Sequence, residues 1–129
     1  MTVPKKFFYT STHEWVRVEN DEIVVGITDF AQEQLSDIRY VELPGVNDVV
    51  SAQDDVAVLE SVKAAADVCA PVDGVITDVN RKLSDRPDLV NSEPYDAGWI
   101  FRMRPDDIGD VDTLLDAESY EELLPEDET

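Results

Sequence analysis

The sequence predicts a mainly β fold, an antiparallel sandwich or barrel that also carries two helices. Three observations support this. Many short apolar or alternating runs are separated by turn residues every several positions. Residues 28–37 and 111–124 instead have the apolar spacing of helices. The 129 residues suit one domain with one core, and no apolar run is long enough to cross a membrane.

The N-terminal part predicts a hairpin followed by a helix. In residues 8–19 apolar and polar side chains alternate, as in a strand with one buried face. Turn residues at 19–21 lead into a second strand at 23–27, so we expect the two strands to pair. The next segment has helical spacing through about Asp37, and Thr28 or Asp29 can cap its start. Such a helix would lie across a sheet.

The rest of the chain repeats the strand and turn pattern. Further strands are predicted at residues 39–43, 49–50, 56–59, 66–70, 75–79 and 99–104. The segment between the last two strands is rich in loop residues. The apolar residues in 111–124 predict a C-terminal helix against the body, and 125–129 reads as a frayed acidic tail. We therefore expect a single domain over residues 1–129.

Lys63 lies at the tip of the central hairpin, between the strands at 56–59 and 66–70. No charged residue lies within two positions of it, and its flanking residues are small. By itself this pattern is typical of an ordinary solvated lysine, which is long, flexible and usually exposed. The alternative is a modification site, because a protruding turn with small flanks gives an acylating enzyme access to the amine.

Glu60-Ser61-Val62-Lys63-Ala64 resembles the lipoylation motif of the glycine cleavage H-protein family. Further blocks resemble that family in the same order: HEWV at 13–16, GITDFAQ at 26–32, YVELP at 40–44, APVDG at 70–74 and NSEPYDAGW at 91–99. The resemblance extends from about residue 8 to residue 124. It implies a barrel-sandwich hybrid of two antiparallel sheets, with a lysine-bearing hairpin, a short helix after the second strand and a C-terminal helix.

The resemblance also implies a function. Such a chain is a non-catalytic carrier subunit with lipoate covalently attached to Lys63 by a lipoylating enzyme. It shuttles an aminomethyl group from the pyridoxal phosphate enzyme glycine decarboxylase to aminomethyltransferase, and electrons to dihydrolipoyl dehydrogenase. An H-like lipoyl-relay protein that supplies lipoate to other enzymes stays open as an alternative. The expected location is the cytoplasm, or the mitochondrial matrix if a leader was removed.

Five further residues match positions to which the resemblance gives roles. Glu60 matches the position that helps the lipoylating enzyme to recognise its target. Thr12, His13, Glu14 and Asp67 match a pocket for the lipoyl-lysine arm. An acidic group there would favour the ammonium form of an amine cargo. Without the resemblance, ordinary surface polarity is the favoured interpretation of Glu14 and Asp67, and Glu60 reads as a carboxylate at the end of a strand.

The sequence departs from the family pattern in two turns. Asn47 and Gln53 stand where relatives commonly have glycine. Asparagine tolerates a left-handed backbone better than other non-glycine residues, so the turn at Asn47 can survive. Gly74, in the turn after the hairpin, is expected to adopt a positive φ.

The amino-acid composition limits which classes of function are possible. A net charge of -20, from 30 acidic and 10 basic residues, argues against nucleic acid and anionic lipid as partners. Such acidity serves either solubility or steering toward basic patches on partner enzymes. The single cysteine, Cys69, allows no internal disulfide and reads as a small core residue. With one histidine and one cysteine, a His/Cys zinc cluster cannot form.

Other carriers of the same general fold fit less well. Biotin carriers place their lysine between methionines, whereas Val62 and Ala64 flank Lys63 here. Lipoyl domains of 2-oxo acid dehydrogenases are shorter and usually have aspartate before the lysine. A plain interaction domain without cofactor is the remaining reading, and intact mass would distinguish it from a lipoylated or biotinylated chain. The sequence has no phosphate-binding loop that would suggest a free-standing enzyme.

Overall fold

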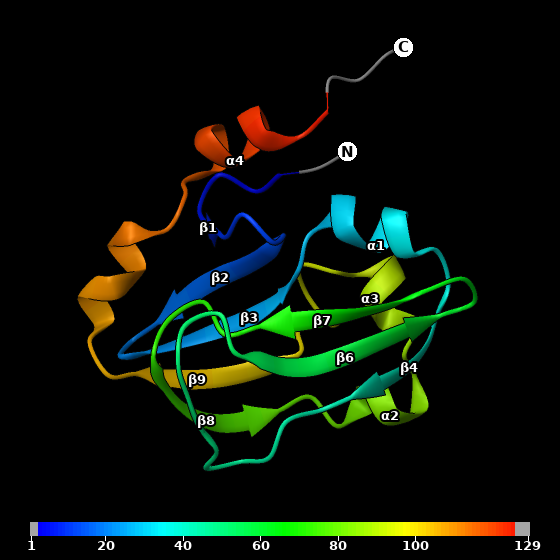
Figure 1. Cartoon of the computed structure of the whole chain (residues 1–129), viewed down its shortest axis with the longest axis horizontal. Helices are drawn as coiled ribbons and strands as arrows, with labels where there is room; N and C mark the ends of the chain where they lie inside the picture. The colour runs from blue at the N-terminus through cyan, green and yellow to red at the C-terminus, as the bar shows by residue number, and fades with distance from the viewer. Residues whose placement is uncertain (1–2, 126–129) are drawn as a thin grey trace.

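The structure is a computed structural model that describes residues 3–125, and its strands form two antiparallel sheets (Figure 1). The larger sheet has the strand order β1-β2-β3-β9-β8-β5, and the smaller has the order β4-β6-β7. The strands are β1 (Phe8–Tyr9), β2 (Glu14–Glu19), β3 (Glu22–Ile27), β4 (Ile38–Glu42), β5 (Val49–Val50), β6 (Asp55–Ser61), β7 (Ala65–Cys69), β8 (Gly74–Val79) and β9 (Phe101–Pro105). The mainly β prediction is confirmed.

Short helices lie between and after the strands. They are α1 (Asp29–Leu35), α2 (Lys82–Asp85), α3 (Leu89–Ser92), the 3-10 helix η1 (Ile108–Thr113) and α4 (Ala117–Leu123). Two of them, α2 and α3, fall in the segment that we predicted to be loop. None of the helices within residues 3–125 is long and apolar enough to span a membrane.

Several element boundaries differ from the prediction, and two of the predicted elements are each divided in two. The strand predicted at 8–19 is two strands, because a tight loop turns β1 back to pair with β2. Helix α1 is capped by Thr28, whose hydroxyl accepts from Ala31 N–H. It ends two residues early, at Leu35, because Ser36 has a φ of 65°. The helix predicted at 111–124 is divided into η1 and α4, because Asp116 accepts from Ser119 N–H and caps a new helix. Of the predicted frayed tail, 126–129 lies outside the described residues.

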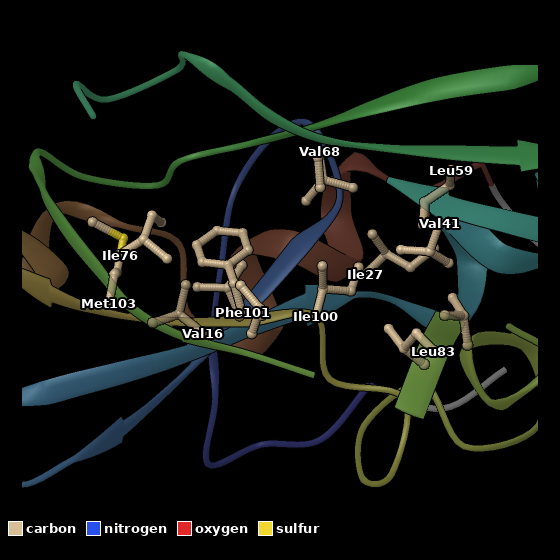
Figure 2. Packing of buried hydrophobic residues seen from close by; sticks show 14 of the residues in the cluster. Val16, Ile27, Val41, Leu59, Val68, Ile76, Leu83, Ile100, Phe101 and Met103 are labelled. Atoms are coloured by element: carbon tan, nitrogen blue, oxygen red, sulfur yellow. The ribbon is translucent and has the colours of Figure 1, made fainter. Parts of the chain in front are cut away.

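The main hydrophobic core lies between the two sheets (Figure 2). Val16, Ile76 and Phe101 come from the larger sheet, and Leu59 and Val68 from the smaller. All five are fully or almost fully buried. Each such aliphatic or aromatic side chain contributes about 1.5–3 kcal/mol by leaving water. The smaller sheet is therefore held in place by the inner faces of β6 and β7.

The two turns that lack glycine keep a left-handed backbone. Asn47 has a φ of 78° and Gln53 a φ of 74°. Backbone hydrogen bonds of 2.7 Å fix both, from Asn47 N–H to Ile76 O and from Gln53 N–H to Ala70 O. The prediction that the turn at Asn47 survives is confirmed, and the turn at Gln53 survives with a residue that tolerates this conformation less well.

The expectation for Gly74 is wrong. No glycine among residues 3–125 has a positive φ. Gly74 begins β8 opposite Pro105, and a Cβ atom at this position would lie 2.3 Å from the carbonyl oxygen of Arg104. Glycine is required there because the neighbouring strand approaches closely, not because the backbone is left-handed.

Gln53→Gly should stabilise the chain. Glycine adopts the left-handed region without the steric cost that glutamine bears, and this outweighs its greater freedom in the unfolded chain. We expect a gain of about 0.5–1 kcal/mol in the free energy of unfolding. Asn47→Gly should gain less, because asparagine is the better tolerated residue. Urea unfolding measures both.

Ala52→Gly is the matched control, since Ala52 is the preceding residue in the same turn and has no positive φ. It should lose about 0.5–1 kcal/mol through unfolded-state entropy alone. A loss of the same size in Gln53→Gly would contradict the proposed strain at Gln53.

Candidate functional site

The turn between β6 and β7 holds Lys63 on a fixed backbone. Ser61 Oγ accepts from the N–H groups of Lys63 (3.3 Å) and Ala64 (3.1 Å). Val62 N–H donates to Asp37 O at 3.1 Å, which ties the turn to the segment that enters β4. Lys63 itself is exposed, and no residue in the described part of the chain forms an ion pair or hydrogen bond with its ammonium group. The backbone is thus held while the side chain is free.

Strand β7 leads away from this turn. Its side chains alternate, so that Val68 enters the core while Ala65, Asp67 and Cys69 follow the outer face. Cys69 lies six positions after Lys63, a distance of about 20 Å along an extended chain. The first part of this path carries only alanine side chains. On the outer face of β7, a long flexible group on Lys63 would pass Ala65 and Asp67 on its way to the cavity.

A cavity of about 560 Å³ lies at the far end of β7. Four chain segments that are distant in sequence surround it: residues 9–12 with Glu14, Gln53, 69–71 and 113–115. Its wall combines hydroxyl groups, one carboxylate, one thiol and aliphatic side chains. Such a mixture suits a mostly apolar ligand that carries a polar end.

Glu14 is the charged residue of this cavity. Its side chain is 1% exposed, and three hydrogen bonds hold it. Its Oε1 accepts from the hydroxyls of Thr10 (2.5 Å) and Thr12 (2.6 Å), and its Oε2 accepts from the backbone N–H of Cys69 (3.1 Å). Burial raises the pKa of Glu14, while these three donors act in the opposite direction. A carboxylate offers about four acceptor positions, so these three donors leave one of them unused.

His13 occupies a different environment from its neighbour. Its Nδ1 lies 2.7 Å from the hydroxyl of Tyr120, which in turn lies 2.7 Å from Thr28 Oγ1. The His13 ring also packs against Phe30, with ring centroids 4.9 Å apart. These contacts join the start of β2 to α1 and α4. Burial lowers the pKa of His13.

The structure brings together only part of the predicted arm pocket. Thr12 and Glu14 line the cavity, whereas His13 and Asp67 are not among its lining residues. Asp67 is exposed on the outer face of β7, between Lys63 and the cavity. Glu60 is exposed near the end of β6, opposite Ala65 on one side and Tyr40 on the other.

Sequence reasoning missed the two cavity residues that join Thr12 in contacting Glu14, namely Thr10 and Cys69. Thr10 was not singled out, although a threonine four residues before a buried glutamate is within reach of its carboxylate. The expectation that Cys69 is a core residue is wrong, because it is only half-buried and lines the cavity. Burial is the main cause that raises the pKa of its thiol to about 11, followed by the charge of Glu14. No group of three or more metal-ligating side chains occurs within residues 3–125.

Known proteins resemble this chain over nearly its whole length. The family model described as glycine cleavage H-protein matches residues 7–127. A glycine cleavage system H protein from Thermus thermophilus is 56% identical over 124 residues, which cover 96% of this chain and 97% of that protein. One from Pseudoalteromonas atlantica is 54% identical over 126 residues, which cover 97% and 98%.

A solved structure agrees with these sequences. The crystal structure of a glycine cleavage system H protein from Mycobacterium marinum superimposes with a TM-score of 0.84 at 35% identity. The superimposed region covers 92% of this chain and 95% of the Mycobacterium marinum chain. Two antiparallel sheets that present a lysine on an exposed hairpin define a carrier protein of the swinging-arm class. The chain belongs to the glycine cleavage H-protein family, and its role is that of the lipoyl carrier in the glycine cleavage system.

The buried environment of His13 predicts a pH dependence of stability. Because its pKa is lower in the folded chain, the folded chain binds fewer protons than the unfolded chain below about pH 6.5. The stability that neutral His13 contributes is thus present above this pH and is lost as the pH falls through the folded-state pKa. His13→Asn removes the titration and tolerates the φ of 74° at this position.

We expect stability to fall less steeply with acidification in His13→Asn than in the unchanged chain. Urea unfolding at several pH values between 5 and 7.5 measures this. Glu14, whose raised pKa acts with the opposite sign, is present in both proteins and cancels in the difference. Equal pH slopes in the two proteins would contradict the assignment of this effect to His13.

Proposed function

We propose that Lys63 carries lipoate and that the cavity at Glu14 shelters the far end of the lipoyl-lysine arm. The arm would shuttle an aminomethyl group from glycine decarboxylase to aminomethyltransferase, and electrons to dihydrolipoyl dehydrogenase. The observation that carries this proposal is an exposed amine without an ion-pair partner in the described chain, on a turn whose backbone is fixed. In this proposal residues 1–129 form one carrier domain, which works in the cytoplasm of a bacterium like those of its relatives.

The residues around Lys63 fit a lipoyl group. Ala64 and Ala65 are small and exposed, so a lipoylating enzyme meets little steric hindrance at the amine. The outer face of β7 offers a path toward the cavity, and the cavity wall has the mixed polarity that a hydrocarbon chain with a polar end requires. When attached, the lipoyl group supplies the disulfide chemistry and the protein supplies placement, so the chain is a carrier subunit rather than an enzyme.

Glu14 gives the cavity a preference for cationic cargo. The amine of a one-carbon cargo is protonated at neutral pH, and an opposite charge in a buried site attracts it more strongly than in water. The same enclosure limits the access of water, which would release the cargo. Thr12 donates to Glu14 from the cavity wall, and Asp67 would attract the same ammonium along the outer face of β7. His13 supports the site from outside, through Tyr120.

Charge also indicates how partner enzymes would meet the chain. On the outer face of the smaller sheet, cross-strand pairing places Glu42 and Asp67 on either side of Val58. Glu60 lies on the same face, next to the lysine turn. Partner enzymes with basic surfaces around their active-site entrances would be attracted to this face. The same acidity disfavours nucleic acid and anionic membranes as partners.

Lys63→Arg should abolish lipoylation. A guanidinium stays protonated at neutral pH and cannot be acylated. Arginine also preserves the positive charge of the turn, so the variant removes only the reactive amine. Intact mass after incubation with lipoate, ATP and a lipoylating enzyme reports the modification. Lys82→Arg, on the exposed helix α2, is the control and should be lipoylated like the unchanged chain. A lipoyl increment on Lys63→Arg would refute the assignment.

Glu60→Gln should slow lipoylation without changing the fold. If the lipoylating enzyme recognises the Glu60 carboxylate through a charge-assisted hydrogen bond, its loss should lower the modification rate about tenfold. Glu42→Gln is the matched control, because it removes a carboxylate from the same outer face at a position farther from the turn. Equal slowing in both variants would indicate a general charge effect instead of recognition of Glu60.

A further inference from the structure

The hydroxyl of Thr10 has its hydrogen-bonding capacity fully used. Thr10 Oγ1 accepts from the backbone N–H groups of Glu14 (3.1 Å) and Thr12 (3.3 Å). A hydroxyl has two acceptor positions and one proton, so both acceptor positions are taken. Its one proton must therefore be donated, and Glu14 Oε1 lies 2.5 Å away. Thr10 is therefore a donor, and Glu14 Oε1 is the nearer of its two possible acceptors, since Thr12 Oγ1 lies 3.2 Å away.

Thr12 is not restricted in this way. Its hydroxyl lies 2.6 Å from Glu14 Oε1 and 3.2 Å from Thr10 Oγ1, and it accepts no backbone N–H. It donates to Glu14 in the observed arrangement, but it could rotate and accept a proton instead. The two threonines thus differ, although both contact the same carboxylate oxygen.

The other oxygen of Glu14 also faces a group that can only donate. Glu14 Oε2 accepts from the backbone N–H of Cys69 at 3.1 Å. A proton on Oε2 would compete with this N–H, and a proton on Oε1 would compete with the Thr10 hydroxyl. The two fixed donors, the Thr10 hydroxyl and the Cys69 N–H, therefore favour the charged carboxylate, whereas Thr12 alone could accept a proton from the neutral acid.

We propose that Thr10 is a positioning residue that keeps Glu14 in its carboxylate form, with one acceptor position left for a cationic group in the cavity. This inference rests on the proposed function, because it specifies how the site would hold the ammonium of the cargo. It assigns to Thr10 a role that acts through Glu14 and not by contact with the arm.

Within residues 3–125, no basic group is among the causes that shift the pKa of Glu14. Cys69 from β7, Tyr9 from β1 and Tyr120 from α4 each have a raised pKa, mainly through burial, and are neutral at neutral pH. The charge of Glu14 contributes to the raised pKa of Cys69 and Tyr120. His13 has a lowered pKa and is directed to Tyr120. The charge of Glu14 thus depends on hydrogen-bond donors alone.

The test is a carbon-13 NMR titration of the Glu14 carboxyl in the unlipoylated chain. Thr10→Val keeps the side-chain shape and removes the hydroxyl, so the Glu14 titration should move to higher pH. Thr10→Ser should restore the original titration. Thr12→Val should move it less than Thr10→Val, because the Thr12 hydroxyl can also accept. Thr113→Val is the control, since Thr113 lines the same cavity and donates to Asp110 O instead.

Two results would overturn the inference: an unchanged Glu14 titration in Thr10→Val, or a shift in Thr12→Val as large as that in Thr10→Val. If Thr10→Val folds and has a lower unfolding temperature but an unchanged Glu14 titration, the inference is overturned. Thr10 would then only stabilise the loop. If Thr10→Val does not fold, Thr10→Ala, which also lacks the hydroxyl, takes its place in the same comparison with Thr12→Val.

A second measurement separates this inference from the proposed function. The second measurement uses protein that is lipoylated and then loaded by glycine decarboxylase. Thr10→Val should release the one-carbon unit about tenfold faster, because a hydrogen bond to a charged group stabilises it by about that factor or more. Thr10→Ser should release it at the original rate. A shifted Glu14 titration with an unchanged release rate would uphold the role of Thr10 toward Glu14 and overturn the proposed pairing of Glu14 with the cargo.

Discussion

The structure depends on the burial of one face of the β6–β7 hairpin. Leu59 and Val68 are 0% and 1% exposed and fix the hairpin against the larger sheet. Because side chains alternate along a strand, this burial also determines which residues face outward. A register shift of one residue would move Asp67 into the core and Val68 into solvent. The outer face of β7 and the direction of the lysine turn are thus consequences of core packing.

Glu14 is a polar link within this apolar arrangement. Its carboxylate connects the loop before β2 to the end of β7, which belongs to the other sheet. A buried carboxylate is costly unless donors surround it, and three donors do so here. The chain therefore places its main buried charge where the two sheets and the cavity meet. Such a link orders the cavity wall, and it also leaves a residual acceptor that a purely structural contact would not need.

Features that depend on a few neighbouring residues could be predicted from the sequence. The hairpin around Lys63 and the left-handed turn at Asn47 were both predictable, because each depends on a few neighbouring residues. The contact between Glu14 and Cys69 was not, because 55 residues separate them and no periodicity links them. Gly74 was misjudged for the same reason: its constraint comes from Arg104 on a neighbouring strand. The division of the C-terminal helix depends on the single cap at Asp116, which competes with an otherwise continuous helical pattern.

The proposed attachment of lipoate would also change the electrostatics of the hairpin. Amide formation removes the charge of Lys63, the only basic residue in β6, β7 and the turn between them. The face that carries Glu60 and Asp67 would then have no positive charge along this hairpin. The net charge of this face would become more negative by one unit at the position where the arm enters the partner. Its attraction to a basic partner surface would therefore increase. In this proposal, the reaction that attaches lipoate to Lys63 would also strengthen the electrostatic attraction between this face and a basic partner enzyme.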